Sequence, residues 1–340
     1  MKPTVHDIAR EAGVSLATVD RVLNRRPGVR AATRERVEAA IDRIGFVRDV
    51  AAANLAKSRT YALAFVIPES DNSFMQALRD EVAAARLRGA LERTDITLIA
   101  VPAFDEAGLA QALDALIANP PAGVAVVAID APAIQSRMER LRDAGVAVVT
   151  LVSDLAASGR DHFTGIDNLA AGRTAGSLMG RFLGGRTGAV AVIAGSLRLG
   201  DHRDRLAGFA ERLGQIAPDV RLLDVMESQD DPARVKSLLT SAFRDHPDLI
   251  GVYNLGAGNR GLVASLSQTT GERPLAIAHE LSPLTRKALE DGLIDAILNQ
   301  DPGHEIRSAI RVLKARADGL PVIAAQERIR IDIFLKDNLP

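Results

Sequence analysis

The chain has no cysteine and no tryptophan, and aromatic residues make up only 3% of its 340 residues. The lack of cysteine excludes disulfides and thiolate chemistry. No apolar stretch approaches the roughly 18 residues that a membrane span needs, so we expect no membrane insertion. No apolar signal segment precedes the first helical pattern, which predicts a cytoplasmic protein. At this length the chain can bury two or three cores, and we therefore expect several domains.

Charge is distributed unevenly, although the formal net charge is only −1. Residues 1–60 contain 12 Lys and Arg against 7 Asp and Glu, a balance of +5, whereas residues 61–340 contain 30 against 36, a balance of −6. Because neutralisation of phosphates supplies most of the sequence-independent affinity for DNA, the basic segment predicts a nucleic-acid-binding end. A solvated charged surface is the alternative interpretation of this bias.

Residues 4–24 have the spacing of two short helices joined by a tight turn. Thr4 and Asp7 form a capping-box pattern, Gly13 permits a left-handed turn, and Ser15 can cap the second helix. A third helix is predicted from about 31 to 44, and Gly45 ends it. We therefore predict a three-helix, helix-turn-helix head. Its expected core residues are Val5, Ile8, Ala9, Ala12, Val14, Val19, Val22, Leu23, Val37, Ala40, Ile41 and Ile44.

The remainder of the chain alternates short apolar runs with amphipathic stretches of helical length. This alternation is typical of parallel sheets with crossover helices, and its two series predict an α/β body of two doubly wound lobes. The predicted strands are 61–67, 96–101, 123–129 and 146–152 in the first series, and 189–194, 220–226, 249–253, 275–278 and 294–298 in the second.

Three sequence runs carry a family resemblance. AGVSLATVDRVLN, the later TRERVEAAI and the following ANLAKSRT resemble the head and hinge of the LacI/GalR (lactose-repressor) family of bacterial transcription regulators. The predicted body is similar to the ribose-type, periplasmic-binding-protein-like sensor domain of that family. The resemblance implies a head over 1–47, a hinge helix or linker over 48–60, and an effector-binding and dimerisation body over 61–340. Lobe 1 would comprise about 61–159 and 301–323, and lobe 2 about 160–300 and 324–340.

The resemblance also implies which head residues contact DNA. The second helix would enter the major groove, where Arg21 is the strongest base-reading candidate because a guanidinium pairs bidentately with guanine. Asp20 stands where a serine is usual: it accepts from a cytosine, reduces affinity, or pairs with a nearby arginine, and we favour the pairing. The expected DNA-binding residues are Ser15, Leu16, Ala17, Thr18, Arg21, Asn24 and Leu55, the last at the position whose side chain wedges into a minor-groove step.

Ligands of such bodies bind between the lobes, at the carboxyl ends of strands. Asn72 and Phe74 resemble an asparagine and a stacking phenylalanine of ribose-type lobes, and Arg205 matches the arginine of an RxxGF motif. Carboxylates suit sugars because they accept hydroxyl hydrogen bonds, although Asp154 or Asp167 can equally cap the next helix. The expected ligand-binding residues are Asn72, Phe74, Asp130, Asp154, Asp167, Arg205, Asn254, Glu280 and Gln300.

Two departures from the family pattern leave the ligand open. The segment YNLGAGNRG lacks the acid that usually follows its asparagine, and His279-Glu280 replaces a pair that usually contains aspartate. A polyol, a modified or acidic sugar, or another small polar metabolite all remain compatible with these residues.

A rival hypothesis comes from a glycine motif. Gly256, Gly258 and Gly261 form G-x-G-x-x-G after a predicted strand, and Glu280 lies at the spacing of the dinucleotide fingerprint, which would indicate an NAD-binding enzyme. The motif lies deep in the second lobe, however, and tight turns explain its glycines more simply. A sugar-binding protein without a regulatory role is a third alternative, but it would need a secretion signal and no basic head.

The patterns together predict a regulator rather than an enzyme. The six histidines lack metal-ligand spacing and no nucleophile elbow is present, so we expect no metal, no cofactor and no catalysis. We predict a homodimeric repressor whose affinity for double-stranded operator DNA is controlled by a sugar, polyol or sugar derivative bound between its lobes. No heptad-bearing tail follows the last strand, so a tetramer is not expected.

Overall fold

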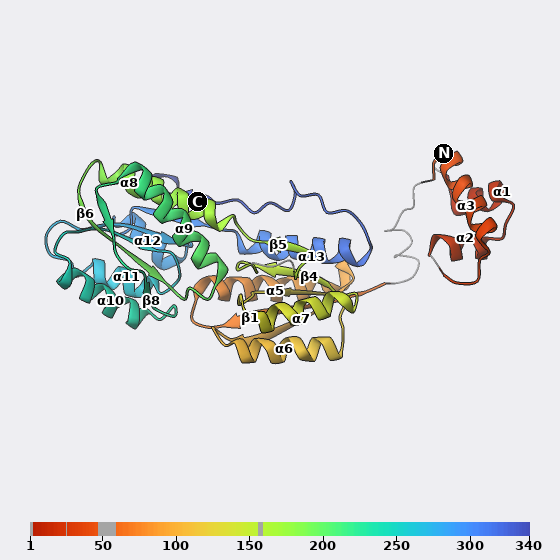
Figure 1. Cartoon of the computed structure of the whole chain (residues 1–340), viewed down its shortest axis with the longest axis horizontal. Helices are drawn as coiled ribbons and strands as arrows, with labels where there is room; N and C mark the ends of the chain where they lie inside the picture. Colours follow the sequence, from red (N-terminus) through yellow and green to blue (C-terminus); the bar gives the residue numbers. More distant parts are fainter. Residues whose placement is uncertain (1–2, 25, 47–58, 156–158) are drawn as a thin grey trace. The chain divides into compact units, whose positions relative to one another are not determined.

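The computed structural model describes residues 3–24, 26–46, 59–155 and 159–340 (Figure 1). The chain divides into two compact units, Met1–Arg59 and Thr60–Pro340. Within the described ranges, no helix is both long and apolar enough to cross a membrane.

The first unit contains the three predicted helices, α1 (Val5–Ala12), α2 (Leu16–Leu23) and α3 (Ala31–Ile44). The backbone N–H of Thr4 donates to Asp7 Oδ2 at 2.9 Å, and the backbone N–H of Thr18 donates to Ser15 Oγ at 3.3 Å. Gly13 and Gly45 end α1 and α3 in the left-handed conformation. Caps thus begin α1 and α2, and left-handed glycines end α1 and α3, where the sequence predicted, which confirms the helix-turn-helix head.

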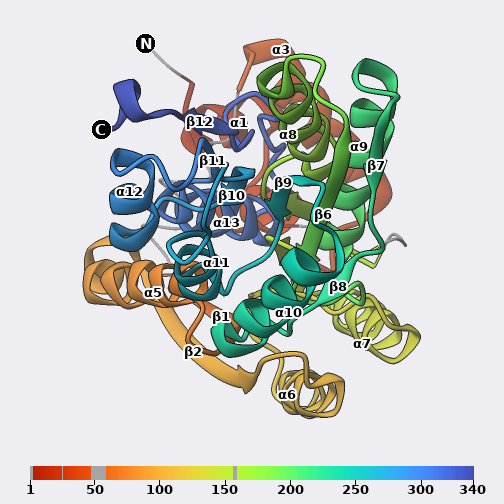
Figure 2. The same ribbon diagram turned by 90° about the vertical axis from the view of Figure 1, so that its left-hand side faces the viewer.

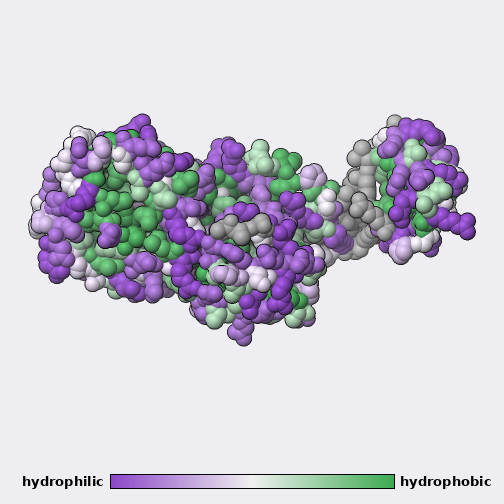
Figure 3. All heavy atoms as spheres, in the orientation of Figure 1, coloured by the Kyte–Doolittle hydropathy of each residue, from purple (hydrophilic) through white to green (hydrophobic). Residues whose placement is uncertain are grey.

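The head has a small apolar core. Ile8, Val19 and Val37 are completely buried at its centre, with Ala12, Val22 and Ala40 around them and the other predicted residues partly buried. Val5 is exposed, so its assignment to the core was wrong: the apolar stripe of α1 runs through Ile8 and Ala12, and Val5 lies at the end of the helix beyond it. On the face seen in Figure 3 the surface of the head is mostly hydrophilic.

The first sheet of the body has the order β2-β1-β3-β4-β5 and is parallel throughout. Four of its strands were predicted. The fifth, His162–Thr164, escaped prediction because three residues with a histidine among them make no apolar run. The strands are β1 (Tyr61–Glu69), β2 (Thr94–Pro102), β3 (Gly123–Val126), β4 (Ala147–Leu151) and β5 (His162–Thr164).

Helices cover both faces of this sheet. Leu63, Phe65 and Ile67 of β1 pack against α5 (Ser73–Glu92) and α13 (Pro302–Ala317). Ala64 and Val66 point to the opposite face, which α6 (Glu106–Ala118) and α7 (Pro132–Asp143) cover. Because both faces are buried, the strand is apolar without interruption. We call this sheet with its four helices lobe 1.

The second sheet has the order β12-β11-β10-β9-β6-β7, and only β12 is antiparallel to its neighbour. The predicted strand 220–226 forms two short strands because its polar residues Arg221 and Asp224 are exposed at the edge of the sheet. The strands are β6 (Gly188–Ala194), β7 (Val220–Leu222), β8 (Met226–Glu227), β9 (Leu249–Asn254), β10 (Leu275–His279), β11 (Ala296–Asn299) and β12 (Asp332–Phe334).

Helices α8 (Asn168–Leu183) and α9 (Gly200–Ile216) lie side by side on one face of the second sheet (Figure 2). The other face carries α10 (Pro232–Asp245), α11 (Asn259–Leu266) and α12 (Pro283–Glu290). Glycines allow α8 and α9 to approach closely: a Cβ at Gly172 would lie 2.1 Å from the carbonyl oxygen of Arg205. We call this sheet with its five helices lobe 2.

The chain passes between the lobes three times. The sequence predicted that lobe 2 begins at about residue 160. The first passage instead follows Thr164, because β5 still pairs with β4 of lobe 1. The second lies between β11 and α13. In the third, Val322 packs in lobe 1 and Ile329 in lobe 2, before β12 and a 3-10 turn, Lys336–Asn338.

Candidate functional site

Polar side chains gather where the carboxyl ends of the two parallel sheets meet. Asn72 Nδ2 of lobe 1 donates to Asp230 Oδ2 of lobe 2 at 3.0 Å, and the backbone N–H of Gly200 donates to Ser153 Oγ at 3.1 Å. The strands of both lobes therefore end at a shared cleft. The predicted residues at these ends are Asn72, Asp130 and Asp154 in lobe 1, and Asn254, Glu280 and Gln300 in lobe 2.

The two candidates after β1 have structural roles. Asn72 Oδ1 caps α5 by accepting the backbone N–H of Phe74 at 2.9 Å and that of Met75 at 3.3 Å. Phe74 lies in the core of lobe 1, and only 7% of its surface is exposed. The expectation that Phe74 offers a ring face for stacking was therefore wrong, since core packing of α5 covers the ring.

The three predicted aspartates are bonded to other parts of the protein. Asp130 forms an ion pair with Arg203 of lobe 2, at 2.5 Å. Asp154 is paired with Arg160 and accepts the hydroxyl of Thr150 at 2.7 Å. Asp167 caps α8, the alternative role that the sequence left open. Much of the acceptor capacity of these carboxylates is thus already used.

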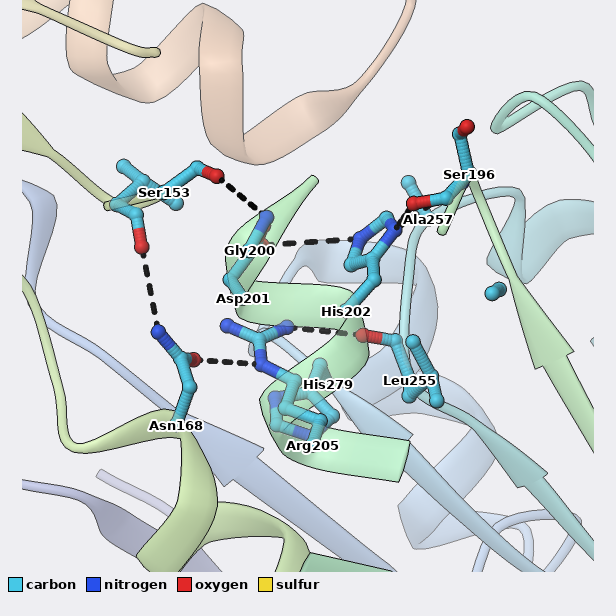
Figure 4. Close-up of polar contacts among 12 residues, drawn as sticks. Ser153, Asn168, Ser196, Gly200, Asp201, His202, Arg205, Leu255, Ala257 and His279 are labelled. Atoms are coloured by element: carbon cyan, nitrogen blue, oxygen red, sulfur yellow. Dashed lines mark hydrogen bonds and ion pairs between the residues drawn. The ribbon is translucent and has the colours of Figure 1, made fainter. Parts of the chain in front are cut away.

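Arg205 has a different environment. It projects from α9, is only 3% exposed, and donates through Nε to Asn168 Oδ1 at 2.8 Å and through Nη1 to the carbonyl of Leu255 at 2.9 Å (Figure 4). Asn168 in turn donates to the carbonyl of Val152 at 3.3 Å. Arg205 Nη2 is buried and has no hydrogen-bond partner among the residues that the structure describes.

Two side-chain amides of lobe 2, like Arg205, each have a buried atom without a hydrogen-bond partner within the described residues. Asn254 Nδ2 donates to Asn259 Oδ1 at 2.8 Å, and Gln300 Nε2 donates to Glu280 Oε1 at 2.9 Å. Their oxygens, Asn254 Oδ1 and Gln300 Oε1, are buried without a partner within the described part of the chain. Unsatisfied buried polar atoms are costly, and several in one place indicate a binding site.

Aromatic side chains form a rigid layer in lobe 2 next to Arg205. The rings of Phe209 and Tyr253 stack with centroids 4.5 Å apart, and the Tyr253 hydroxyl lies 2.8 Å from His279 Nε2. Burial, reinforced by Arg205, holds the pKa of His279 well below its usual value, so the imidazole is neutral. The layer therefore adds no positive charge to the cleft.

Glu280 directly follows β10 in a left-handed backbone conformation, with φ of 68°. Burial raises the pKa of its carboxyl to about 7, against the lowering effects of Arg205 and of the hydrogen bond from Gln300. A strained backbone and a perturbed carboxyl together are typical of functional positions.

Sequence reasoning missed several polar residues of the cleft. Asp201 lies one helical turn before Arg205 on α9, a spacing that places both on one face. Asn168 directly follows Asp167, and it is Asn168 that holds the arginine. Glu305, in the first turn of α13, is fully buried, and an acid among apolar helix positions was its only signal. Asp230 had no signal at all, because its partner Asn72 is 158 residues away.

The glycine motif is explained by packing. A Cβ at Gly261 would lie 2.0 Å from the carbonyl oxygen of Pro232, and one at Gly256 would lie 2.7 Å from the backbone nitrogen of Gly195. The loop N–H of Ala257 donates to Asp230 Oδ1 at 3.0 Å. Since a carboxylate already occupies this N–H and would repel a pyrophosphate, the geometry argues against the dinucleotide hypothesis.

In the head, α2 presents Leu16, Ala17 and Arg21 on its exposed surface. Asp20 forms an ion pair with Arg26 at 3.2 Å, the favoured alternative, and accepts from Asn24 Nδ2 at 2.6 Å. Ser15 and Thr18 are linked through their hydroxyls at the start of α2. Leu55 lies outside the described residues.

Two families match the chain in adjacent segments. Residues 4–49 match the lacI family of bacterial regulatory proteins, and residues 63–321 match the periplasmic binding protein domain family. The family resemblance predicted from the sequence is confirmed.

Curated relatives are regulators. The chain is 41% identical over 78 residues to catabolite control protein A of Priestia megaterium, covering 23% of this chain and 24% of that protein. It is 33% identical over 174 residues to the HTH-type transcriptional regulator MalR of Streptomyces coelicolor, covering 50% and 48%. The matched part thus spans less than half the length of either relative.

Solved structures resemble the body. A solute-binding protein from Burkholderia graminis in complex with D-arabinose has a TM-score of 0.75 at 25% identity, covering 83% of this chain and 97% of that one. GanP, a glucose-galactose binding protein from Geobacillus stearothermophilus, has a TM-score of 0.74 at 22% identity, covering 83% and 99%. The predicted two-lobed α/β fold is therefore confirmed.

Proposed function

Because this chain belongs to the lacI family of bacterial regulatory proteins, with a periplasmic-binding-protein body, we propose that it is a transcription regulator controlled by a small polar ligand. The observation that carries the ligand site is buried Arg205 with an unsatisfied guanidinium nitrogen, flanked by two amides with unsatisfied oxygens, within the described residues. A core position would not retain such atoms, whereas a ligand with hydroxyl groups can satisfy them.

The head would read operator DNA through α2. Arg21 is exposed and would pair with guanine, Leu16 and Ala17 would contact base methyl groups, and Ser15, Thr18 and Asn24 would approach phosphates. Leu55 would wedge into the minor groove. The ion pair with Arg26 lessens the repulsion between Asp20 and the DNA backbone.

The body would bind a sugar, polyol or sugar derivative. Arg205, Asn254, Glu280 and Gln300 would contact it from lobe 2, and the ligand would favour one arrangement of the lobes. Such a ligand changes DNA affinity only through its different affinity for two arrangements, and relief of repression is the proposed outcome.

A homodimer in the cytoplasm is the assembly that we propose. Leu87 and Leu91, one turn apart on α5, are 88% and 89% exposed. An apolar stripe of this kind suits a second copy of the chain, and paired heads suit a palindromic operator. Neither catalysis nor a cofactor is part of this proposal.

Selection of binding sequences from a pool of random DNA duplexes, followed by gel-shift titration, tests the function. We expect a palindromic sequence, and Arg21→Ala should weaken its binding by about 1 to 3 kcal/mol and relax one base position. Arg36→Ala, an exposed arginine on α3, is the matched control. Enrichment of no sequence, or equal losses in the two variants, would contradict the proposal.

A further inference from the structure

The unsatisfied atoms of the cleft are mostly hydrogen-bond acceptors. Within the described part of the chain, the buried oxygens without a partner near Arg205 are Asp201 Oδ1, Asn254 Oδ1, Gln300 Oε1 and both carboxyl oxygens of Glu305. Arg205 Nη2 is the one unsatisfied atom among these residues that can only donate, and His279 Nδ1 does either according to its tautomer. A matching ligand must therefore offer more donors than acceptors.

The acceptors belong to one group. Asp201 and Arg205 lie one turn apart on α9, and Gln300 is bonded to Glu280 and lies five residues before Glu305 on the same connection into α13. Burial, and after it the charge of Glu280, raises the pKa of Glu305 well above its usual value, while Arg205 acts in the opposite direction. Residues from α9, α13 and the end of β10 are thus close enough for their charges to interact.

Carboxyl groups outnumber cationic groups among these residues. Within the described residues, the buried or part-buried carboxyls Asp201, Glu280 and Glu305 lie near the guanidinium of Arg205, while His279 is neutral and His202 Nε2 lies 3.7 Å from Asp201 Oδ2. Burial raises the pKa of both glutamates, so Glu305 keeps its proton at neutral pH unless a cation is close to it. A buried carboxylate without a counter-charge is costly, and a cation entering this space would supply that charge, allow these carboxyls to ionise and form charge-assisted hydrogen bonds with them.

We propose that the cleft selects a small polyhydroxylated ligand bearing a protonated amine, that is, an amino sugar or amino polyol, with its ammonium group held by Glu280 and Glu305. This inference rests on the ligand site of the proposed function and specifies its chemical class. An ammonium has three donors and no acceptor, whereas a hydroxyl brings two acceptor lone pairs for each donor. A sugar acid would form no ion pair with these carboxyls and would oppose their ionisation.

Matched pairs of sugars test the selection. Thermal shift and calorimetric titration of the full chain would compare D-glucosamine with D-glucose, D-galactosamine with D-galactose and D-mannosamine with D-mannose, and would include D-glucuronate. We expect at least one amine to bind about tenfold or more tightly than its neutral partner, which corresponds to about 1.4 kcal/mol. If a neutral sugar or D-glucuronate binds best, or if no amine shifts the melting temperature, the proposal is wrong.

Charge-neutral variants locate the selectivity. Glu305→Gln and Glu280→Gln should each reduce the preference for the amine over its neutral partner, whereas the matched control Glu290→Gln, an exposed glutamate on α12, should retain it. The melting temperature of each unliganded variant reports folding. A preference that is unchanged in both cleft variants would overturn the assignment of these carboxyls.

Proton release provides an independent readout. An ammonium that ionises a protonated carboxyl expels a proton, so the binding enthalpy of the amine should depend on the ionisation enthalpy of the buffer, and that of its neutral partner should not. Absence of this dependence would contradict the inference. Gel-shift titration separates it from the proposed function: amine selectivity without DNA binding would refute only the regulator, and DNA binding with a preference for neutral sugars would refute only the ligand class.

Discussion

The two lobes contribute different kinds of side chain to the cleft. The lobe 1 candidates are committed to protein partners: Asn72 caps α5, Asp130 pairs with Arg203, and Asp154 pairs with Arg160. The lobe 2 candidates Arg205, Asn254 and Gln300 each retain a buried atom without a partner in the described ranges. Among the residues predicted from the sequence, this contrast supports the proposal that lobe 2 contributes most of the ligand contacts, to which lobe 1 adds Glu305 of α13, whereas Asn72 and Asp130 of lobe 1 bond to lobe 2.

The polar contacts between the lobes are weak enough to change when a ligand binds. The Asn72–Asp230 hydrogen bond and the Arg203–Asp130 ion pair are partly exposed to solvent, and such contacts contribute about 1 kcal/mol or less each. Contacts of this strength can be made and broken as ligand binds. A buried polar atom of lobe 2 that lacks a hydrogen-bond partner costs more than this, about 1 to 3 kcal/mol.

The most severe test of the comparison is Arg205→Ala. Loss of the bonds to Asn168 and Leu255 should lower the free energy of unfolding by about 3 kcal/mol and remove the ligand-induced shift in melting temperature. Arg203→Ala, on the same helix but half exposed, should keep most of that shift. An unchanged ligand response in the Arg205 variant would exclude this residue from the site.

Glu280 gives lobe 2 a pH dependence. Its pKa is about 7 in the folded chain against an ordinary 4.5, so between these values the unfolded chain ionises while the folded chain keeps the proton. Stability should be fully present below pH 4.5 and fall as the pH rises towards 7, by at most about 3 kcal/mol. Urea unfolding across this range should show a smaller fall for Glu280→Gln and an unaltered fall for Glu290→Gln. A rise in stability over the same range would contradict the assignment.

Asp154→Asn tests lobe 1. Loss of the charge that pairs with Arg160 should lower the free energy of unfolding by about 1 to 2 kcal/mol, while the ligand dissociation constant stays unchanged. Chemical unfolding and calorimetric titration measure the two quantities separately. If ligand affinity falls as far as in Arg205→Ala, Asp154 also recognises the ligand and the comparison fails.

The smallest expected effect is that of Asp230→Asn, which targets the contact between the lobes. An amide offers one acceptor oxygen where the carboxylate offers one each to Asn72 and Ala257, so ligand affinity should fall by about 1 kcal/mol, or roughly fivefold. Asp224→Asn, exposed in lobe 2, is the control. Tighter binding in the Asp230 variant would show that the contact opposes the ligand.

Most of the fold could be predicted because its signals are local. The bond from Thr4 to Asp7 spans three residues, and the apolar run of β1 identifies a strand buried on both faces without reference to its neighbours. β5 and β12 were not predicted, since three-residue strands at sheet edges have no pattern of their own. Val5 was misplaced because helical spacing marks a face but not where the core ends.

The sequence by itself determined the capped head and the alternation of the two lobes, and its short motifs singled out Arg205, Asn254 and Gln300, each of which keeps a buried atom without a partner within the described residues. Tertiary structure alone decided which polar groups already have partners. Phe74 packs in the core, and Asp154 forms an ion pair with Arg160. Asp201, Asp230 and Glu305 lie among the polar residues of the cleft although the sequence did not single them out. The physical reason is that satisfaction of a buried polar atom depends on partners brought from distant strands and helices, which spacing along one segment does not contain.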